Sequence, residues 1–319
     1  MKKDLTFLKK NRLTQYNRTD PDAKVMVKPA HNLMAYNSQI VVDDSFKFIV
    51  ATEVSSDGND YGKLHSMATQ TKEITKNDDI TIVADTGYYS AKEIEKCQED
   101  GIDAVVSMPN KEKQQKDRGF FLHSDFIYDK EIDSYICPNQ QILTKSNSVI
   151  TKDNATKNYV YRAGSKTCKA CPLRDNCIPK KTAYKRVSRS ECLDSVIKHK
   201  EKMQSNIAKE LIKRRGSIVE HPFGTIKRHL GWEHFLVRGI EKVSGENALI
   251  MFSYNFRRLL NLIGIALFRK LIIALKDGNI QEIKGEIEAY ILLFLDIWKY
   301  FIKIREFYNF REESVIYME

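Results

Sequence analysis

The 319-residue chain lacks the features that mark secreted and membrane-spanning proteins. Its first 18 residues are basic but contain no apolar core segment, so no secretory signal is expected. The most apolar stretch, residues 259–276, is interrupted by Arg269 and Lys270. This interruption favours a buried amphipathic helix over a bilayer span. Together these absences predict a cytoplasmic protein with no membrane partner.

Cysteine is scarce as well. Six cysteines at uneven spacing in a chain of this length do not suggest a secreted disulfide scaffold, and there is no internal repeat or low-complexity tract. Basic residues, in contrast, are in surplus: 52 Lys and Arg against 42 Asp and Glu give a net charge of +10. Such a surplus favours a polyanionic partner, because neutralising phosphates releases counterions, although many solvated surfaces carry similar charge.

Hydrophobic patterning predicts an α/β layer structure in the first third of the chain. The expected elements are strands at 36–43 and 46–55, a helix within 60–76, a strand ending at Asp85, a helix at 91–99 and a strand at 103–109. Asp44 and Ser45 would join the first two strands as a hairpin. This order of strands and helices is typical of helices packed on a sheet.

Changes in composition and hydrophobic pattern along the sequence predict five parts of the chain. These are an irregular leader at 1–30, an α/β core at 31–110, a cysteine-bearing insertion at 111–190, a helical part at 191–265 and a helical pair at 266–319. The last part is rich in Ile, Leu, Phe and Tyr, so it is expected to pack on itself or on a partner chain.

Two carboxylates are candidates for chemistry. Asp85 follows an apolar strand, where open α/β folds place their sites, but it could equally start a turn or cap the next helix. Glu220 stands seven residues before Lys227 in RRGSIVEHPFGTIKRHLG. A carboxylate among cations suits metal and phosphate chemistry, although such interleaving is usually a solvated helix face. Pro222 predicts that the helix kinks or restarts there.

Three segments in combination resemble the bacterial insertion-sequence transposases of the DDE class. They are ADTGYYS at 84–90, RRGSIVEHPFGTIKRHLG at 214–231 and NALIMFSYNFRRLLNLIG at 247–264. The resemblance extends from about residue 18 to about residue 265. It implies an RNase H-like α/β core in which two aspartates and a glutamate bind a divalent metal ion, usually Mg²⁺. The cysteine-bearing insertion and the carboxy-terminal helices would complete this fold.

Carried over residue by residue, the resemblance makes Asp85 the second aspartate and Glu220 the glutamate. Lys227 matches the basic residue that follows the glutamate by seven positions. Arg215 matches the arginine of the same signature, although it precedes Glu220 by five residues where the stricter signature has four. The tyrosine of the signature has no counterpart, and Ile212 lies near its place.

The first aspartate is absent from its expected context. In the family it lies on a first strand before the hairpin, in an Asp-Gly-Thr-like sequence, and this chain starts too late for that strand. Asp20 and Asp22 lie in a turn-like segment, and Asp43 ends a hairpin strand. We therefore expect a core that is truncated at the amino terminus and inactive alone. Either the strand at 36–43 or the strand ending at Asp85 should then have an unpaired edge, or residues 1–30 should fill the gap between them.

The resemblance implies metal-dependent strand cleavage and transfer of the freed 3′ hydroxyl to target DNA. Asp85 and Glu220 would hold Mg²⁺ or Mn²⁺, while Lys227 and Arg215 would position phosphates. Double-stranded DNA, both transposon ends and target, is the implied partner in the bacterial nucleoid, and the helical end leaves room for a homodimer. Two alternatives stay open: a metal-dependent nuclease on the same scaffold, and a non-catalytic DNA-binding remnant.

Four cysteines form a separate pattern. Cys168, Cys171 and Cys177 occur in CKACPLRDNC, and Cys137 lies some thirty residues upstream in YICP. Four thiolates from two loops would close a tetrahedral site, for which zinc is the default metal. The alternative is that they are reduced cysteines with a packing role.

Aromatic residues near the carboxy-terminal basic segments leave two roles open. Trp232 could stack on a DNA base beside basic residues that contact phosphates. For Trp232, Phe235 and Phe252 taken singly, a place in the hydrophobic core is the favoured interpretation.

Overall fold

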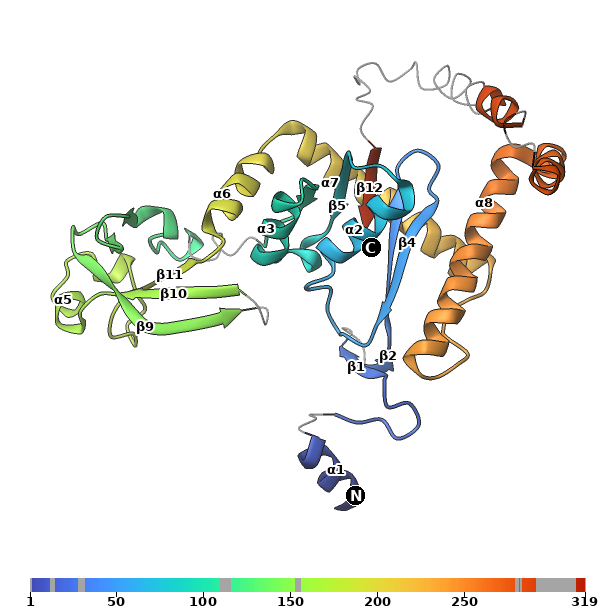
Figure 1. Cartoon of the computed structure of the whole chain (residues 1–319). Coiled ribbons are helices and arrows are strands. Elements are labelled where there is room, and N and C mark those ends of the chain that lie inside the picture. Colours follow the sequence, from blue (N-terminus) through green and yellow to red (C-terminus); the bar gives the residue numbers. More distant parts are fainter. Residues whose placement is uncertain are drawn as a thin grey trace. The chain divides into compact units, whose positions relative to one another are not determined.

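The structure is a computed structural model that describes residues 2–11, 15–27, 32–109, 116–152, 156–278, 281, 283–290 and 314–318. It is a mixed α/β protein (Figure 1) with two compact units. Unit 1 comprises Met1–Asn59, Gln70–Thr81 and Arg215–Glu319, and unit 2 comprises Asp60–Thr69 and Ile82–Arg214.

In unit 1 the two strands expected near the amino terminus form an antiparallel hairpin. Strand β3 (Asn37–Asp43) pairs with β4 (Ile49–Ser55), with Ile40 opposite Thr52. The Asp43 carboxylate accepts hydrogen bonds from the backbone amides of Phe46 and Phe48, which closes the turn between the strands. Four successive residues of β3, from Gln39 to Val42, are buried. Both faces of this strand are therefore covered.

Strand β12 (Ser314–Met318) lies where an unpaired edge, or residues 1–30, had been expected. It pairs antiparallel with β3, and Tyr317 stands opposite Val42. The strand order of the sheet is β4-β3-β12-β5-β6. Figure 1 shows β12 in dark red within this sheet. Because β3 is paired on both sides, its ladder groups have partners. The expectation of a gap was wrong, because the end of the chain supplies a strand and not only helices.

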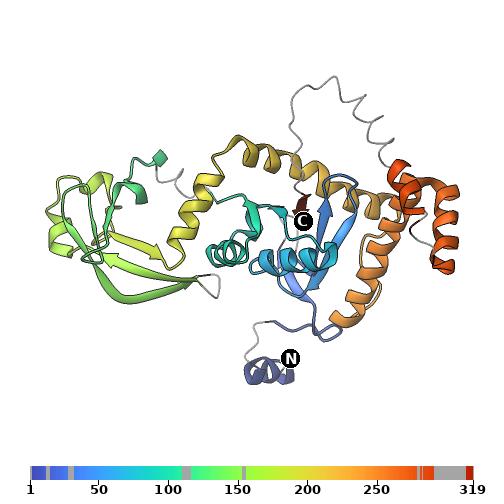
Figure 2. The ribbon, with the colours of Figure 1, turned by 45° about the horizontal axis from the view of Figure 1, so that its top comes forward.

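Helix α8 (Ile240–Asp277) packs against this hairpin (Figure 2). Asn255 accepts a hydrogen bond from the Ile49 amide and donates to the Ile49 carbonyl, at 2.8 and 2.7 Å, as a neighbouring strand would. Asn247 accepts from the Ser38 hydroxyl at 2.7 Å. The helix breaks at Gly264, whose positive φ of 74° suits a residue without a Cβ.

The described parts of segment 1–30 contain regular secondary structure that its polar sequence did not predict. It contains helix α1 (Lys2–Asn11) and strand β1 (Lys24–Val27), which pairs antiparallel with β2 (Asn32–Ala35). The turn between α1 and β1 carries two aspartates whose side chains contact the start of α8, as described below.

Unit 2 contains the end of β5 (Ile80–Ala84), strand β6 (Asp103–Val106) and helices α3 (Ala91–Glu99) and α6 (Leu193–Lys202). Helix α2 (Leu64–Thr75) begins in this unit. The buried Glu93 carboxylate accepts from the His65 amide at 3.0 Å and from the Lys96 ammonium at 2.8 Å. These bonds tie the start of α2 to α3 and satisfy a charge that would be costly to bury alone.

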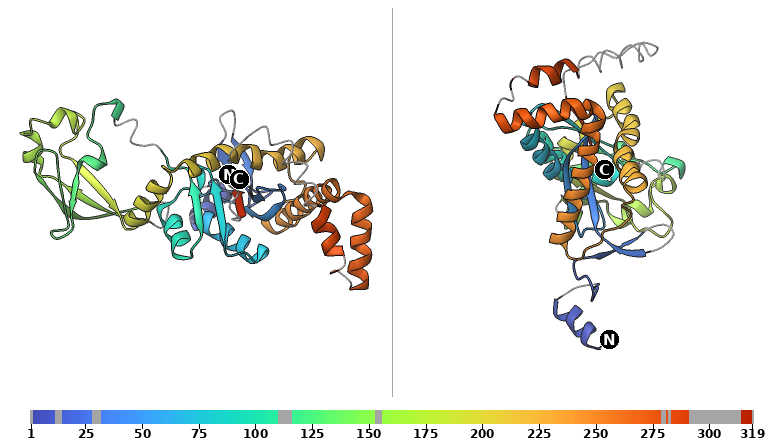
Figure 3. Two further views of the ribbon diagram at one scale, coloured as in Figure 1. Left: turned by 90° about the horizontal axis from the view of Figure 1, so that it is seen from above. Right: turned by 90° about the vertical axis from the view of Figure 1, so that its right-hand side faces the viewer.

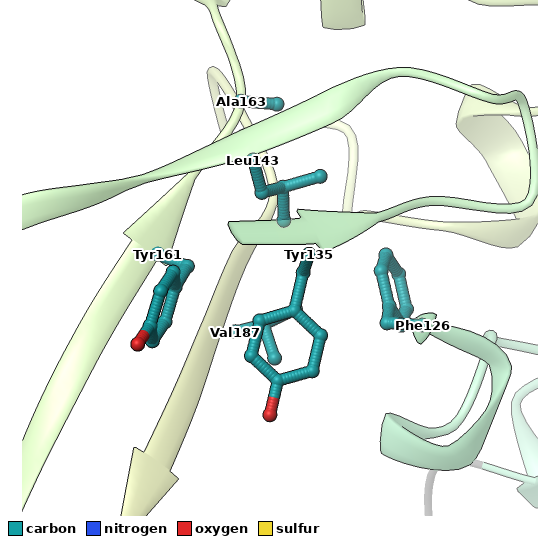
Figure 4. Close-up of a cluster of buried hydrophobic side chains, with 6 residues drawn as sticks. All are labelled: Phe126, Tyr135, Leu143, Tyr161, Ala163 and Val187. Atoms are coloured by element: carbon teal, nitrogen blue, oxygen red, sulfur yellow. The ribbon is translucent and has the colours of Figure 1, made fainter. Parts of the chain in front are cut away.

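A second sheet in unit 2 has the strand order β11-β10-β9-β8-β7. Its strands are β7 (Ile127–Asp129), β8 (Ser134–Ile136), β9 (Ile142–Lys152), β10 (Thr156–Arg162) and β11 (Arg186–Ser190). All neighbouring pairs are antiparallel. Figure 4 shows its core, which is made by Phe126, Tyr135, Leu143, Tyr161, Ala163 and Val187. The sheet therefore has a hydrophobic core of its own.

The end of α8 packs against the helix at 283–290 (Figure 3). Ile263, Leu267 and Ile283 form the buried centre of this contact, with Leu271 and Ile287 beside them. Several apolar residues of the expected buried helix nevertheless face solvent, among them Ile265 and Ile273. No helix among the described residues is long and apolar enough to cross a membrane.

Candidate functional site

Asp85 stands where the buried strand β5 ends. All five residues of β5 are buried, and the chain then turns into the short 3₁₀ helix η1 (Thr86–Tyr88). The Asp85 carboxylate accepts from the Gly87 amide at 2.7 Å and so caps this helix. The sequence-based alternative that Asp85 starts a turn is therefore confirmed.

A second carboxylate in unit 2, Asp60, was not identified from the sequence. A Cβ added to Gly87 would lie 3.0 Å from an oxygen of Asp60 and 3.0 Å from an oxygen of Asp85. Two carboxylates thus border the same glycine, from segments 25 residues apart in the sequence. Nothing in the local sequence of Asp60, which precedes α2 in a turn, distinguishes it from an ordinary surface residue.

In unit 1, Glu220 lies on helix α7 (Asn206–Gly224), with its side chain exposed. It is one helical turn after Gly216, where an added Cβ would lie 3.5 Å from a carboxylate oxygen of Glu220. Pro222 lies inside the same helix and lacks an amide hydrogen for the usual bond to the preceding turn. The helix continues to Gly224 and widens into a π-helical turn, η4 (Thr225–His229). The expected disturbance is therefore a widening of the helix that begins three residues after the proline.

The two basic residues of the expected signature have different surroundings. Lys227 is exposed on η4, with its ammonium 5.5 Å from the ring centre of Phe223. The Arg215 guanidinium donates to the carbonyl of Met318 at 3.1 Å. Arg215 therefore holds the end of strand β12, a structural contact that sequence reasoning did not anticipate.

The three aspartates considered for the missing first position all have structural contacts. Asp20 accepts from the Tyr36 hydroxyl at 2.6 Å and from the Gly239 amide at 3.1 Å. Asp22 accepts from the Ile240 amide at 2.9 Å. Together they satisfy amides at the start of α8, where negative charge is favoured by the helix dipole. The third, Asp43, closes the β3–β4 turn.

The aromatic residues near the carboxy-terminal bases are only partly buried. The Trp232 indole donates to the Glu246 carboxylate at 3.2 Å, and Phe235 packs edge-on against Tyr36. Phe252 is 65% exposed and stacks on Phe256, so the expectation of a core position for Phe252 was wrong.

Four cysteines gather at one end of the second sheet of unit 2. Cys137, Cys168 and Cys177 pack against its hydrophobic core. Burial raises the pKa of the Cys177 thiol; nearby Lys185 lowers it, and negative charge on the other three cysteines raises it further. The Cys137 sulfur also accepts from the Gln141 amide at 3.4 Å. All four cysteines are free thiols, and no group of three or more metal-ligating side chains is found in the described part of the chain.

The remaining two cysteines, Cys97 and Cys192, are buried in the α3–α6 region. Burial raises the pKa of each thiol to about 12. The Cys192 thiol donates to the Glu95 carboxylate at 3.3 Å. Thiols of this kind are unreactive packing residues.

Comparison with known families gives one match. Residues 136–260 match the family model described as a transposase DDE domain. The matched segment contains Glu220, Arg215, Lys227 and the four gathered cysteines, whereas Asp85 lies upstream of it. The resemblance to DDE-class transposases is thereby confirmed. No similar protein was found among curated sequences, and no similar structure among solved ones.

Proposed function

Starting from this resemblance to DDE-class transposases, we propose that the chain acts on insertion-sequence DNA as a transposase of that class. The observation that carries the proposal is the match of residues 136–260 to a transposase DDE domain. The basic surplus supports it, because a net charge of +10 favours contact with DNA phosphates. An RNase H-like core, bacterial origin and action in the nucleoid belong to the same proposal.

In this proposal Asp85 and Glu220 supply carboxylate ligands to Mg²⁺ or Mn²⁺. Carboxylate oxygens are the donors that such hard cations prefer, and Asp60 beside Gly87 adds another in unit 2. A bound divalent ion would polarise the phosphate and activate the attacking oxygen. Lys227, exposed on η4, would meet backbone phosphates. Arg215 would act indirectly, by holding strand β12.

We further propose that the chain alone binds DNA without cutting it, which is the non-catalytic alternative. The supporting observation is that Asp20, Asp22 and Asp43 are used by the fold. They contact backbone amides at the start of α8 and in the β3–β4 turn. A carboxylate held in this way is poorly placed to serve as the first metal ligand.

The test uses the full chain and duplexes that carry terminal inverted repeats from the DNA flanking its coding sequence. We expect preference for these ends over unrelated duplexes, and no cleavage with Mg²⁺ or Mn²⁺. Equal affinity for all duplexes would argue against a transposase, and degradation of any duplex would indicate a nuclease. Site-specific cleavage lost in Asp85→Asn but kept in Asp79→Asn, at the other end of β5, would show an active enzyme instead.

We also propose a structural zinc ion at Cys137, Cys168, Cys171 and Cys177. The supporting observation is that Cys137, Cys168 and Cys171 all lie close enough to Cys177 to affect its pKa, so the four sulfurs are near neighbours. Four neighbouring cysteine sulfurs are the ligand set that zinc prefers in structural sites. Zinc content of purified protein should approach one per chain and should fall in Cys171→Ser but not in Cys192→Ser. Protein that binds neither zinc nor iron would contradict the proposal.

A further inference from the structure

A polar cavity of about 190 Å³ lies in unit 1 between two helical faces. One face carries His221 of α7 and His229 of the π-turn η4, eight residues later. The other carries Arg257, Arg258 and Asn261 of α8. Asn261 follows Arg257 by four residues and Arg258 by three, so it lies next to both on the helix surface. The cavity has the size of a small polyatomic group with its surrounding water.

The back of this cavity is held in place by hydrogen bonds to the β3–β4 turn. Arg258 donates from Nε to the Phe46 carbonyl at 2.6 Å, and the Tyr254 hydroxyl donates to the Lys47 carbonyl at 2.8 Å. The single hydroxyl proton of Tyr254 is thereby used, so the 3.0 Å contact with His221 is a donation from Nδ1 of the imidazole. The wall is consequently preorganised before any ligand enters.

The mouth of the cavity, in contrast, presents donors without partners. Arg257, His229 and Asn261 make no hydrogen bond or ion pair within the described residues. No Asp or Glu is among the residues that line the cavity. Burial, and after it the positive charges of Arg258 and Lys47, lowers the pKa of His221, which shows an electropositive interior. A cavity with these properties favours an anionic ligand.

We propose that this cavity binds one phosphate of a DNA backbone. A guanidinium with its full fork of donors suits phosphate oxygens, and charge-assisted bonds of this kind are the strong ones. The phosphate would belong to a polymer and not to a free ion, because Lys227 and Arg228 are exposed on the π-turn that carries His229. These two side chains would contact the phosphates on either side of the bound one. The inference deepens the proposed DNA-binding function and rests on it.

The test compares two arginines of the same helix in the full-length protein. Arg257 lines the cavity, whereas Arg269 is exposed twelve residues further on, beyond the break at Gly264, and does not line it. Binding of a fluorescent duplex is measured from about 50 to 200 mM salt. We expect Arg257→Gln to weaken binding about tenfold, as for loss of a charge-assisted bond. It should also reduce the salt slope by about one, while Arg269→Gln stays near wild type.

A second variant, Asn261→Asp, places a negative charge in the cavity and should weaken binding at least as much, with thermal melting as the check on folding. Competition with inorganic phosphate shows whether the cavity binds a free phosphate ion as well as a DNA phosphate. At matched ionic strength, inorganic phosphate should compete with the duplex for the wild-type protein and not for Arg257→Gln. If Arg257→Gln and Arg269→Gln bind the duplex equally, the proposal is overturned, even if phosphate alone binds. Wild-type protein that binds no DNA would contradict the proposed function itself.

Discussion

Gly87 is a residue whose missing side chain matters for its neighbours. Its amide donates to Asp85, and a Cβ at this position would approach oxygens of both Asp85 and Asp60 to 3.0 Å. Contacts of this length are tighter than most that a Cβ makes, so each carboxylate would have to shift slightly to accommodate a side chain. The glycine thus allows two carboxylates to lie against one turn.

This geometry predicts the effect of Gly87→Ala. The added methyl should displace both carboxylates and cost about 1–3 kcal/mol of folding free energy, as overpacking does. Mn²⁺ binding, measured by electron paramagnetic resonance, should weaken if Asp60 and Asp85 are ligands. Gly245→Ala is the matched control, because a Cβ there meets nothing within 4 Å. Wild-type Mn²⁺ affinity in Gly87→Ala would remove both residues from the metal site.

Two histidines should make stability depend on pH. Burial lowers the pKa of His199 and of His221 from the ordinary value of 6.5. The unfolded chain therefore binds protons at these residues at higher pH than the folded chain does. Their contribution to stability is complete above about pH 6.5 and is lost as the pH falls toward the folded values.

Urea unfolding between pH 7.5 and 5 checks this prediction. We expect the free energy of unfolding to fall over this range, and to fall less steeply in His199→Gln. Glutamine can still donate to the Val106 carbonyl, which His199 contacts at 2.9 Å, but it does not titrate. An unchanged pH dependence in this variant would assign the acid sensitivity to other groups.

At the scale of elements, strand β12 is the least expected part of the fold. Besides its ladder with β3, the Val315 carbonyl accepts from the Asp44 amide at 3.1 Å, and the Met318 carbonyl accepts from Arg215. Ile316 is only 2% exposed. The five residues of β12 are thus held by strand β3, by the Asp44 amide and by the Arg215 side chain.

Truncation of one side chain measures how much β12 contributes. Ile316→Ala should reduce the free energy of unfolding by about 2–5 kcal/mol, the usual cost at a buried site. Ile142→Ala is the matched control, because Ile142 is 54% exposed on β9, and its effect should stay within about 0.5 kcal/mol. A similarly small effect for Ile316→Ala would mean that β12 is not part of the folded sheet in solution.

For the whole molecule, net charge determines how DNA binding should depend on salt concentration. A net charge of +10 should give binding to duplex DNA that weakens steeply with salt. The double variant Lys227→Ala, Arg228→Ala should weaken binding and flatten the dependence on salt concentration, because both side chains are exposed on η4. Affinity that does not change between about 50 and 200 mM salt would argue against phosphate contacts as the main contribution.

Local sequence patterns were enough to predict several helices and strands. Alternating apolar residues and a short turn gave the β3–β4 hairpin, and the abrupt end of an apolar run placed Asp85 directly after β5. Helix α3 begins and ends where its spacing predicted. The sequence alone also showed that RRGSIVEHPFGTIKRHLG resembles a transposase motif. The family match at residues 136–260 includes this segment. Each of these features depends on residues close together in the chain.

The tertiary structure decided the features that join distant segments. Asp20 meets Gly239 across 219 positions, and residues 314–318 supply β12. The β3–β4 turn accepts the hydrogen bond that holds Arg258 in the wall of the cavity on α8. Asp60 and Asp85 came together in the same way. Their individual sequence contexts are those of ordinary turns and strands. Composition and periodicity report which face of an element is buried, but which partner covers it depends on the packing of the whole chain.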